Sequence, residues 1–213
     1  MTSEVDRIAH VLCGSLQTAL LNLQALALTM DRDPAAQEAI ASIRAELLRG
    51  ARMLVGAFDV LSIELGEIRR VNLRLLVTRA LAAHGIDHVM VAPGKWPDVS
   101  VDERLVALAV AHLARNASAA TPPDTRRPEI SVRAQGAGRV EILVRDWGRG
   151  FEGGKPPGRA FRSSRGDHAA TGLLSAERIA RLHGGGLSFA SSPRGTQVRL
   201  SLPAEAQTRP RRS

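Results

Sequence analysis

The sequence predicts an α+β protein in which an antiparallel helical hairpin precedes a mixed α/β sandwich. Two observations support this fold class. Apolar residues recur at steps of three and four from residue 8 to residue 65, which indicates long amphipathic helices. After residue 68, apolar helical segments are interleaved with short segments in which apolar and polar residues alternate, as in strands. We therefore expect a helical domain over residues 1–67, a mixed domain over 68–204 and a disordered basic tail over 205–213.

The first domain is predicted to consist of two helices joined by a short turn. The helix over residues 3–31 has a stripe of apolar side chains: Ile8, Leu12, Ala19, Leu23, Leu26 and Met30. The segment MDRDP interrupts this pattern, and Asp33 followed by Pro34 is typical of a helix N-cap and first turn. The second helix has a more regular, coiled-coil-like seam: Ile40, Ile43, Leu47, Ala51, Leu54, Phe58, Leu61 and Leu65.

One hairpin cannot cover both of its apolar faces, because each helix has a wide stripe and only one neighbour. Pairing of two chains into a four-helix bundle would cover them. We therefore expect a homodimer through the hairpin. The alternative is that the hairpin packs on the downstream domain.

In the second domain, helices are predicted over residues 72–84, 101–120 and 171–183. Strands are predicted for the segments IDHVMV, EISVRAQ, RVEILVRD, GLSFASS and TQVRLSLP. The helices are expected to cover one face of a mostly antiparallel sheet. Residues 147–171 are rich in Gly, Pro, Arg and Ser, and a loop of this length in a compact domain is usually functional.

Composition limits the classes of function. The formal net charge is +8, but the arginines are spread over every predicted element and no nucleic-acid-binding motif accompanies them. DNA binding is therefore the weakest hypothesis, although an acidic, phosphorylated partner could use this charge. The single cysteine, Cys13, allows no intrachain disulfide. We find neither an uninterrupted run of about 18 apolar residues nor an export signal, so we expect a cytoplasmic protein without a membrane span.

Two motifs suggest a nucleotide site. The motif D-x-G-x-G at Asp146, Gly148 and Gly150 directly follows a predicted strand. A buried carboxylate there can accept a hydrogen bond from an adenine amino group, and glycines let the backbone approach the base. On the helix over 101–120, the amide oxygen of Asn116 can bind Mg²⁺ that bridges phosphates. His112 lies four residues earlier, on the same helical face.

A third motif, AFRSSRGDHAATGL, is expected to form a loop over the phosphates. Phe161 can anchor this loop, with three polar side chains near the phosphates: Ser163, Ser164 and Arg165. The helix that opens near Gly172 would offer unpaired N–H groups and a positive dipole end to the phosphates. A closing turn at Gly195–Thr196 is expected before the last strand.

The order and spacing of these motifs resemble those of the sensor histidine kinases of two-component systems. The resemblance covers about residues 5–203. The loop after Phe161 is similar to the family's F-x-T-T-K pattern, with Ser163 and Ser164 for the threonines and Arg165 for the lysine. Further along the chain, Thr171-Gly172-Leu173 and His183-Gly184-Gly185 follow in the family's order.

The resemblance implies a Bergerat-type α/β sandwich that binds ATP between the Asn116 helix and the loop. It assigns Asn116 to Mg²⁺ and Asp146 to adenine, and it assigns Gly148, Gly150 and Gly172 to backbone approach. The other residues expected to bind nucleotide are His112, Phe161, Ser163, Ser164, Arg165, Thr171, Leu173 and Thr196. His183 and its glycines are expected to end a helix.

The segment IAHVLCGSLQTALLNLQAL is similar to the family's phosphoacceptor helix, H-E-L-x-x-P-L-x-x-I, which makes His10 the expected phosphoacceptor. The chain departs from the family at several positions. Val11 replaces the acidic residue and Ser15 the proline, which predicts a straighter helix. His168-Ala169-Ala170-Thr171-Gly172-Leu173 replaces G-x-G-x-G-L, and His112 replaces an asparagine. These departures leave the turnover of ATP open.

The leading hypothesis is a cytoplasmic, homodimeric protein-histidine kinase. With ATP and Mg²⁺ it would phosphorylate His10, within or between chains, and pass the phosphoryl group to an aspartate of a response regulator receiver domain. Input would come from a partner, such as a separate sensor protein, or from a missing segment. The alternative is a histidine phosphotransfer protein or pseudokinase scaffold with weak or no ATP turnover. A serine kinase or partner-switching regulator with the same ATP fold would lack the helical hairpin.

Overall fold

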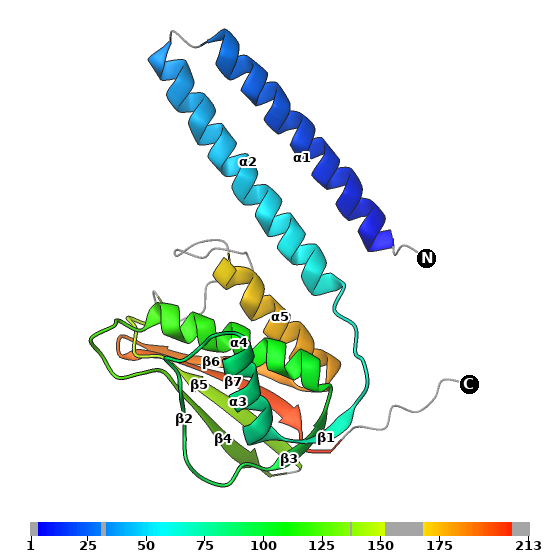
Figure 1. The fold of residues 1–213 in the computed structure, drawn as a ribbon, viewed down its shortest axis with the longest axis vertical. Coiled ribbons are helices and arrows are strands. Elements are labelled where there is room, and N and C mark those ends of the chain that lie inside the picture. Colours follow the sequence, from blue (N-terminus) through cyan, green and yellow to red (C-terminus); the bar gives the residue numbers. More distant parts are fainter. Residues whose placement is uncertain (1–3, 31–32, 137, 152–167, 206–213) are drawn as a thin grey trace. The chain divides into compact units, whose positions relative to one another are not determined.

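A computed structural model of the chain describes residues 4–30, 33–136, 138–151 and 168–205. Contacts divide the chain into two compact units, Met1–Ser62 and Ile63–Ser213. The first unit is a helical hairpin and the second is an α/β sandwich (Figure 1). The predicted fold class is therefore confirmed.

The hairpin consists of α1 (Glu4–Thr29) and α2 (Pro34–Leu61), which pack side by side in opposite directions (Figure 1). Asp33 caps α2 as predicted, because its Oδ1 accepts hydrogen bonds from two backbone amides of the first turn, at 3.0 and 3.2 Å. Gln37 closes the connection by donating from Nε2 to the carbonyl oxygens of Ala27 and Met30, at 2.7 and 3.1 Å.

Packing within the hairpin leaves much of its apolar surface exposed. Ile40 is the only hydrophobic residue classed as buried among those described in the hairpin. Several large apolar side chains of α1 are exposed by more than a third: Ile8, Val11, Leu12, Leu21, Leu26 and Leu28. On α2 the same holds for Ile43, Leu48, Val55 and Leu61. Burial of apolar surface contributes about 25 cal/mol per Å². Contact of these exposed side chains with a second apolar surface would therefore stabilise the hairpin strongly.

One feature of α1 bears on the sequence-based expectation that the chain has no membrane-spanning segment. The stretch Ile8–Thr29, with a mean hydropathy of 1.5, is long and apolar enough to cross a membrane by length and composition alone. Scattered polar side chains interrupt every purely apolar run in this stretch, which is why no uninterrupted run was found in the sequence. They lower the mean hydropathy too little to exclude a membrane-spanning helix. A single helix of this kind near the N-terminus is weak evidence, and a partner helix would use the same apolar surface.

The second unit contains a five-stranded and a two-stranded sheet. Its strands are β1 (Arg69–Asn72), β2 (Met90–Val91), β3 (Asp98–Val101), β4 (Glu129–Gln135), β5 (Arg139–Arg145), β6 (Gly186–Ser192) and β7 (Gly195–Pro203). Its helices are α3 (Leu73–Ala83), α4 (Glu103–Ala120) and α5 (His168–Leu182). The larger sheet has the order β2-β4-β5-β7-β6, in which only β2 and β4 pair in parallel. The helices cover one face of this sheet (Figure 1).

Alternation along the strands separates a core face from an outer face. On β5, Val140, Ile142 and Val144 are at most 2% exposed, and they pack in one cluster with the buried sides of α3, α4 and α5. The neighbouring positions on β5 point to the other side of the sheet and are mainly polar. The deep core therefore forms from Leu, Ile, Val and Ala, as the scarcity of aromatic residues requires.

The structure differs from the sequence-based expectations at several places. Strands β1 and β3 pair with each other, although neither was predicted; each has only four residues. β2 is shorter than the predicted strand. The helix α2 ends at Leu61, and the next apolar residue, Ile63, packs against the core of the second unit instead of continuing the seam. The turn before β7 lies at residues 193–194 rather than at Gly195–Thr196, which already belong to the strand.

Candidate nucleotide-binding site

Asp146 follows the last residue of β5, and its side chain is 7% exposed. Its Oδ1 accepts hydrogen bonds from the backbone amides of Gly148 and Thr196, at 2.9 and 3.1 Å. Both bonds go to one oxygen, so Oδ2 accepts none from the residues that the structure describes. A buried carboxylate held in this way has a free oxygen for an external donor such as an amino group.

The two glycines of the D-x-G-x-G motif are constrained by neighbouring backbone. A Cβ on Gly148 would lie 2.4 Å from the carbonyl oxygen of Ala120, at the end of α4. A Cβ on Gly150, which has φ of +69°, would lie 2.1 Å from the carbonyl oxygen of Ser192. The loop after Asp146 is therefore packed tightly between α4 and the β6–β7 turn, and this packing fixes the position of Asp146.

Thr196 is a second fixed point of the site. It is buried, its amide donates to Asp146, and its carbonyl accepts from the Asp146 amide at 2.9 Å. Gly195 beside it has φ of +115°, and a Cβ there would lie 2.1 Å from the carbonyl oxygen of Asp146. Because β7 approaches the D-x-G-x-G motif this closely, position 195 has no room for a side chain and requires glycine.

Asn116 and His112 lie one turn apart on α4, and both are half-buried. The Nδ2 atom of Asn116 is buried and has no hydrogen-bond partner among the described residues, which is costly unless a ligand or water pairs with it. Burial lowers the pKa of the His112 imidazole, and the positive charge of Arg115, with a smaller contribution from His84, lowers that pKa further. This shift favours the neutral form of His112.

The helix α5 brings Gly172 against His112. A Cβ on Gly172 would lie 3.2 Å from Nδ1 of His112, so the two helices approach closely at this point. Thr171 and Leu173 flank the contact, and both are half-buried. The helix begins at His168 rather than near Gly172, so its unpaired N–H groups belong to the turn that starts at residue 168. Positions 168 and 170, where the family has glycine and this chain has His and Ala, are thus helical.

Several expected site residues lie elsewhere or outside the described residues. The loop residues Phe161, Ser163, Ser164 and Arg165 fall outside them. His10 is exposed on α1, which belongs to the other compact unit. Its helix continues without interruption from Glu4 to Thr29, and the Ser15 hydroxyl donates to the Val11 carbonyl at 3.1 Å, a bond that a proline could not make.

The structure adds supporting residues that sequence reasoning missed. The Ser191 hydroxyl accepts a hydrogen bond from the Phe151 amide at 2.7 Å and lies 3.2 Å from the Thr196 hydroxyl. The Thr121 hydroxyl accepts from the Trp147 amide at 3.2 Å. These bonds join β6 and the end of α4 to the loop, and no local sequence signal predicts them because the partners are far apart in the chain.

His183 is buried and joins two helix ends. Its Nδ1 bonds the Ile179 carbonyl at 2.8 Å, and its Nε2 accepts from the Asp102 amide at 3.0 Å. Asp102 in turn caps α4 and accepts from the Gly66 amide through Oδ2 at 2.8 Å. His183 therefore has a structural role in the described structure, at the end of α5.

The donor set is compatible with Mg²⁺ and ATP. Among the described residues no group of three or more His, Cys, Asp or Glu side chains could hold a metal ion by itself. Mg²⁺ commonly takes only one or two protein oxygens together with phosphate oxygens. The amide oxygen of Asn116 on α4 could be one such ligand, and the second oxygen of the buried Asp146 carboxylate would remain for the amino group of adenine.

Comparison with known proteins supports this interpretation. Residues 101–206 match the family model described as histidine kinase-, DNA gyrase B-, and HSP90-like ATPase. Sequence comparison with curated proteins gives no match.

Solved structures with the same fold include several histidine kinases. A mycobacterial sensor histidine kinase, MprB, aligns with a TM-score of 0.53 and 20% identity over 66% of this chain and 99% of that one. Full-length ShkA in complex with AMPPNP aligns with a TM-score of 0.58 and 17% identity over 96% of this chain, which spans only 46% of ShkA. The Acinetobacter baumannii histidine kinase AdeS aligns with a TM-score of 0.54 and 12% identity, over 89% of this chain and 95% of AdeS.

Proposed function

Because residues 101–206 form an ATP-binding domain of the histidine kinase-, DNA gyrase B- and HSP90-like ATPase family, of the sensor histidine kinase type, we propose that this protein is a cytoplasmic protein-histidine kinase. It would use Mg-ATP to phosphorylate His10 and pass the phosphoryl group to an aspartate of a response regulator receiver domain. The input would come from a separate sensor protein or from a further segment of the same protein.

The observation that carries the proposal is the geometry of Asp146. Two backbone amides fix its Oδ1, so Oδ2 is oriented and free to accept from the amino group of adenine. One turn of α4 would provide the second half of the site: Nδ2 of Asn116, which has no hydrogen-bond partner among the described residues, could donate to a phosphate oxygen. Mg²⁺, when bound, would neutralise phosphate charge, and the amide oxygen of Asn116 is its expected protein ligand. Full-length ShkA, which shares the fold, was crystallised with AMPPNP.

His10 supplies the nucleophile. In the reaction, an imidazole nitrogen forms a bond to the γ-phosphorus while the bond from that phosphorus to the oxygen of the leaving ADP breaks. The imidazole proton then passes to solvent or to a base. Val11, which is 65% exposed, stands where the family has an acidic residue, so this proton has no carboxylate acceptor at the neighbouring position. Slow autophosphorylation follows from this substitution.

One observation favours the alternative, a histidine phosphotransfer protein or pseudokinase. The positions that correspond to two glycines of the family's phosphate loop, His168 and Ala170, are the first turn of α5. A helix there has fewer free backbone N–H groups for phosphates than a glycine loop. Such a protein would still accept a phosphoryl group on His10 from a receiver domain.

Labelling with γ-labelled ATP and Mg²⁺ tests the proposal, with His10→Ala and Asp146→Asn as variants. We expect acid-labile, base-stable label on the full chain and on neither variant. Calorimetric titration with Mg-ATP separates the two hypotheses: binding without label indicates a pseudokinase, and absence of binding in a folded protein indicates a phosphotransfer protein. Transfer from a phosphorylated receiver domain to His10, without ATP, is the positive test of the latter.

A further inference from the structure

The face of the larger sheet that the helices leave uncovered carries a group of arginines. Strand alternation places Arg133, Arg139, Arg145 and Arg199 on this side, because their neighbours on β4, β5 and β7 point into the core. Arg126 and Arg194 lie at the same end of the sheet as Arg145, around one hollow. We name these six residues the basic face.

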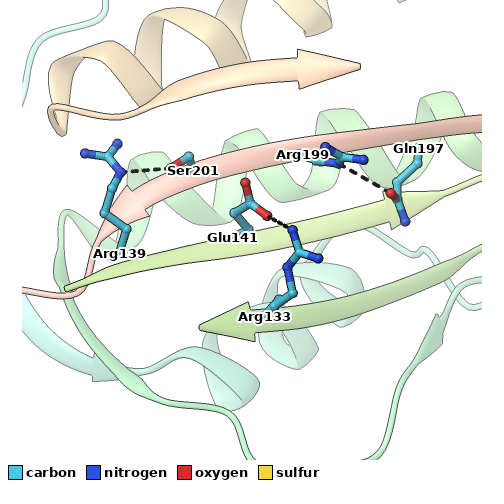
Figure 2. A network of polar contacts seen from close by, with 6 residues as sticks. All are labelled: Arg133, Arg139, Glu141, Gln197, Arg199 and Ser201. Atoms are coloured by element: carbon cyan, nitrogen blue, oxygen red, sulfur yellow. Dashed lines mark hydrogen bonds and ion pairs between the residues drawn. The ribbon is translucent and has the colours of Figure 1, made fainter. Parts of the chain in front are cut away.

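Carboxylates compensate only part of this charge. Among the described residues, Glu129 pairs with Arg126 and Glu141 with Arg133, each at 3.2 Å. Other guanidinium groups bond to neutral acceptors (Figure 2). Arg139 donates to the Ser201 hydroxyl at 3.2 Å, and Arg199 donates to the Gln197 side chain at 3.4 Å. The basic face therefore keeps an excess of positive charge.

One end of the basic face is hollowed around Trp147. The hollow has a volume of about 590 Å³ and is lined by Thr125, Arg126, Arg145, Trp147, Ser192 and Arg194. The guanidinium carbons of Arg126 and Arg145 lie 4.8 and 4.3 Å from the centre of the Trp147 ring.

The groups around this hollow are held in place but not fully paired. The indole Nε1 of Trp147 donates to the Arg127 carbonyl at 3.0 Å, which fixes the ring. The Nε atom of Arg145 is buried and finds no hydrogen-bond partner in the part of the chain that the structure describes. The lining thus contains three arginines, one aromatic side chain and no carboxylate.

We infer that the basic face, centred on Trp147, docks an acidic segment of a partner protein. Guanidinium groups pair with carboxylates through two parallel hydrogen bonds, and Trp and Arg contribute most to binding at protein interfaces. A fixed Trp with adjacent guanidiniums loses little side-chain entropy on binding. The inference does not depend on an active nucleotide site, because the hollow is lined by Trp147 and not by Asp146, whose side chain is buried.

Single-stranded nucleic acid is a less suitable occupant. Its bases need a series of free aromatic faces, and the outward positions of β4, β5, β6 and β7 carry no aromatic side chain. Among the described residues that line the hollow, Trp147 alone carries a ring, and two guanidinium groups already pack against it. An acidic protein segment needs no second ring.

Fluorescence anisotropy of a labelled Glu- and Ala-rich peptide, titrated with the 213-residue chain at fixed ionic strength, tests this inference. We expect the double variant Arg126→Gln/Arg194→Gln to bind the peptide about tenfold more weakly. The control variant, Arg74→Gln/Arg79→Gln, removes the same charge from exposed positions of α3 and should bind as the wild type does. Thermal unfolding of each variant checks folding, and the single variant Arg194→Gln, at an exposed turn, replaces the double variant if the latter unfolds.

Equal weakening by both double variants would overturn the inference, because net charge alone would then explain binding. Absence of peptide binding at low salt would overturn it as well. A labelled oligonucleotide of equal charge that bound more tightly than the peptide, with the same dependence on Arg126 and Arg194, would reassign the basic face to nucleic acid.

Discussion

The two compact units of this chain complete their cores to very different degrees. The ATP-binding domain buries a continuous cluster of side chains from three helices and the sheet, many of them fully inaccessible. The hairpin buries Ile40 and exposes large apolar residues along both helices. A domain with a closed core can fold by itself, whereas the hairpin requires a further surface for its apolar stripes. A second copy of the hairpin is the partner that we propose.

Truncation of a core side chain in the ATP-binding domain should cause the largest loss of stability. It tests the difference between the two units most directly. Ile142→Ala removes a fully buried side chain from β5 and should lower the free energy of unfolding by about 2–5 kcal/mol. Both tryptophans, Trp96 and Trp147, lie in the second unit, so their fluorescence during urea unfolding reports on this domain alone.

The matched control is Ile43→Ala on α2, whose side chain is 49% exposed. Followed by far-UV circular dichroism at a dilution where the chain is monomeric, it should cost less than about 0.5 kcal/mol. A cost as large as that of Ile142→Ala would show that the hairpin is already closed within one chain.

Placing a charge on the exposed stripe of α1 should have the next largest effect. Ile8, Leu12, Leu26 and Met30 share one side of the helix, and burial of one such side chain is worth about 1.5–3 kcal/mol. Leu26→Glu should therefore raise the dimer dissociation constant by at least about tenfold, measured by sedimentation velocity.

Leu28→Glu provides the control, because Leu28 is 76% exposed and two positions along, on a different side of α1. It should leave the dimer intact. If α1 crossed a membrane instead, lipid would surround it, and both substitutions would reduce its recovery in membrane vesicles to the same degree.

Removal of the His183 side chain should cause an intermediate loss of stability. It tests how far a buried polar contact, in addition to the apolar core, stabilises the ATP-binding domain. His183→Ala leaves the buried Asp102 amide without its acceptor, which should cost about 1–3 kcal/mol in urea unfolding. His183→Asn, which can present an acceptor at a shorter reach, should recover part of that loss. An unchanged midpoint for His183→Ala would mean that the two helix ends are held by apolar packing alone.

The sequence could predict features that local patterns determine. Asp33 and Pro34 mark the start of α2, and alternation along residues 139–145 marks a strand with one buried face, because neighbouring residues decide both. The strands β1 and β3 are too short for such a pattern and are stabilised by pairing with each other across the chain.

The candidate site shows the same division. Asp146 could be found from its motif, but its two amide donors include Thr196, fifty positions away in the chain. The buried, unpaired amide of Asn116 and the contact between Gly172 and His112 depend on how α4 and α5 cross, which no local pattern encodes. The start of α5 at His168 was likewise missed, because lost glycines let the helix extend.

The smallest expected effect is a pH dependence of the ATP-binding domain that originates at His112. Burial, and then the charges of Arg115 and His84, lower the pKa of this imidazole below its unfolded value of 6.5. Below about pH 6.5 the unfolded chain takes up a proton that folded His112 does not, so the stability that neutral His112 maintains above pH 6.5 decreases as the pH falls toward the folded pKa. His112→Asn should give a flatter stability profile than the wild type between about pH 7 and pH 5. Urea unfolding followed by tryptophan fluorescence at several pH values measures this difference. Because the hairpin contributes no tryptophan, a profile that stays equally steep in His112→Asn would assign the pH dependence to another group of the same domain and contradict the role of His112.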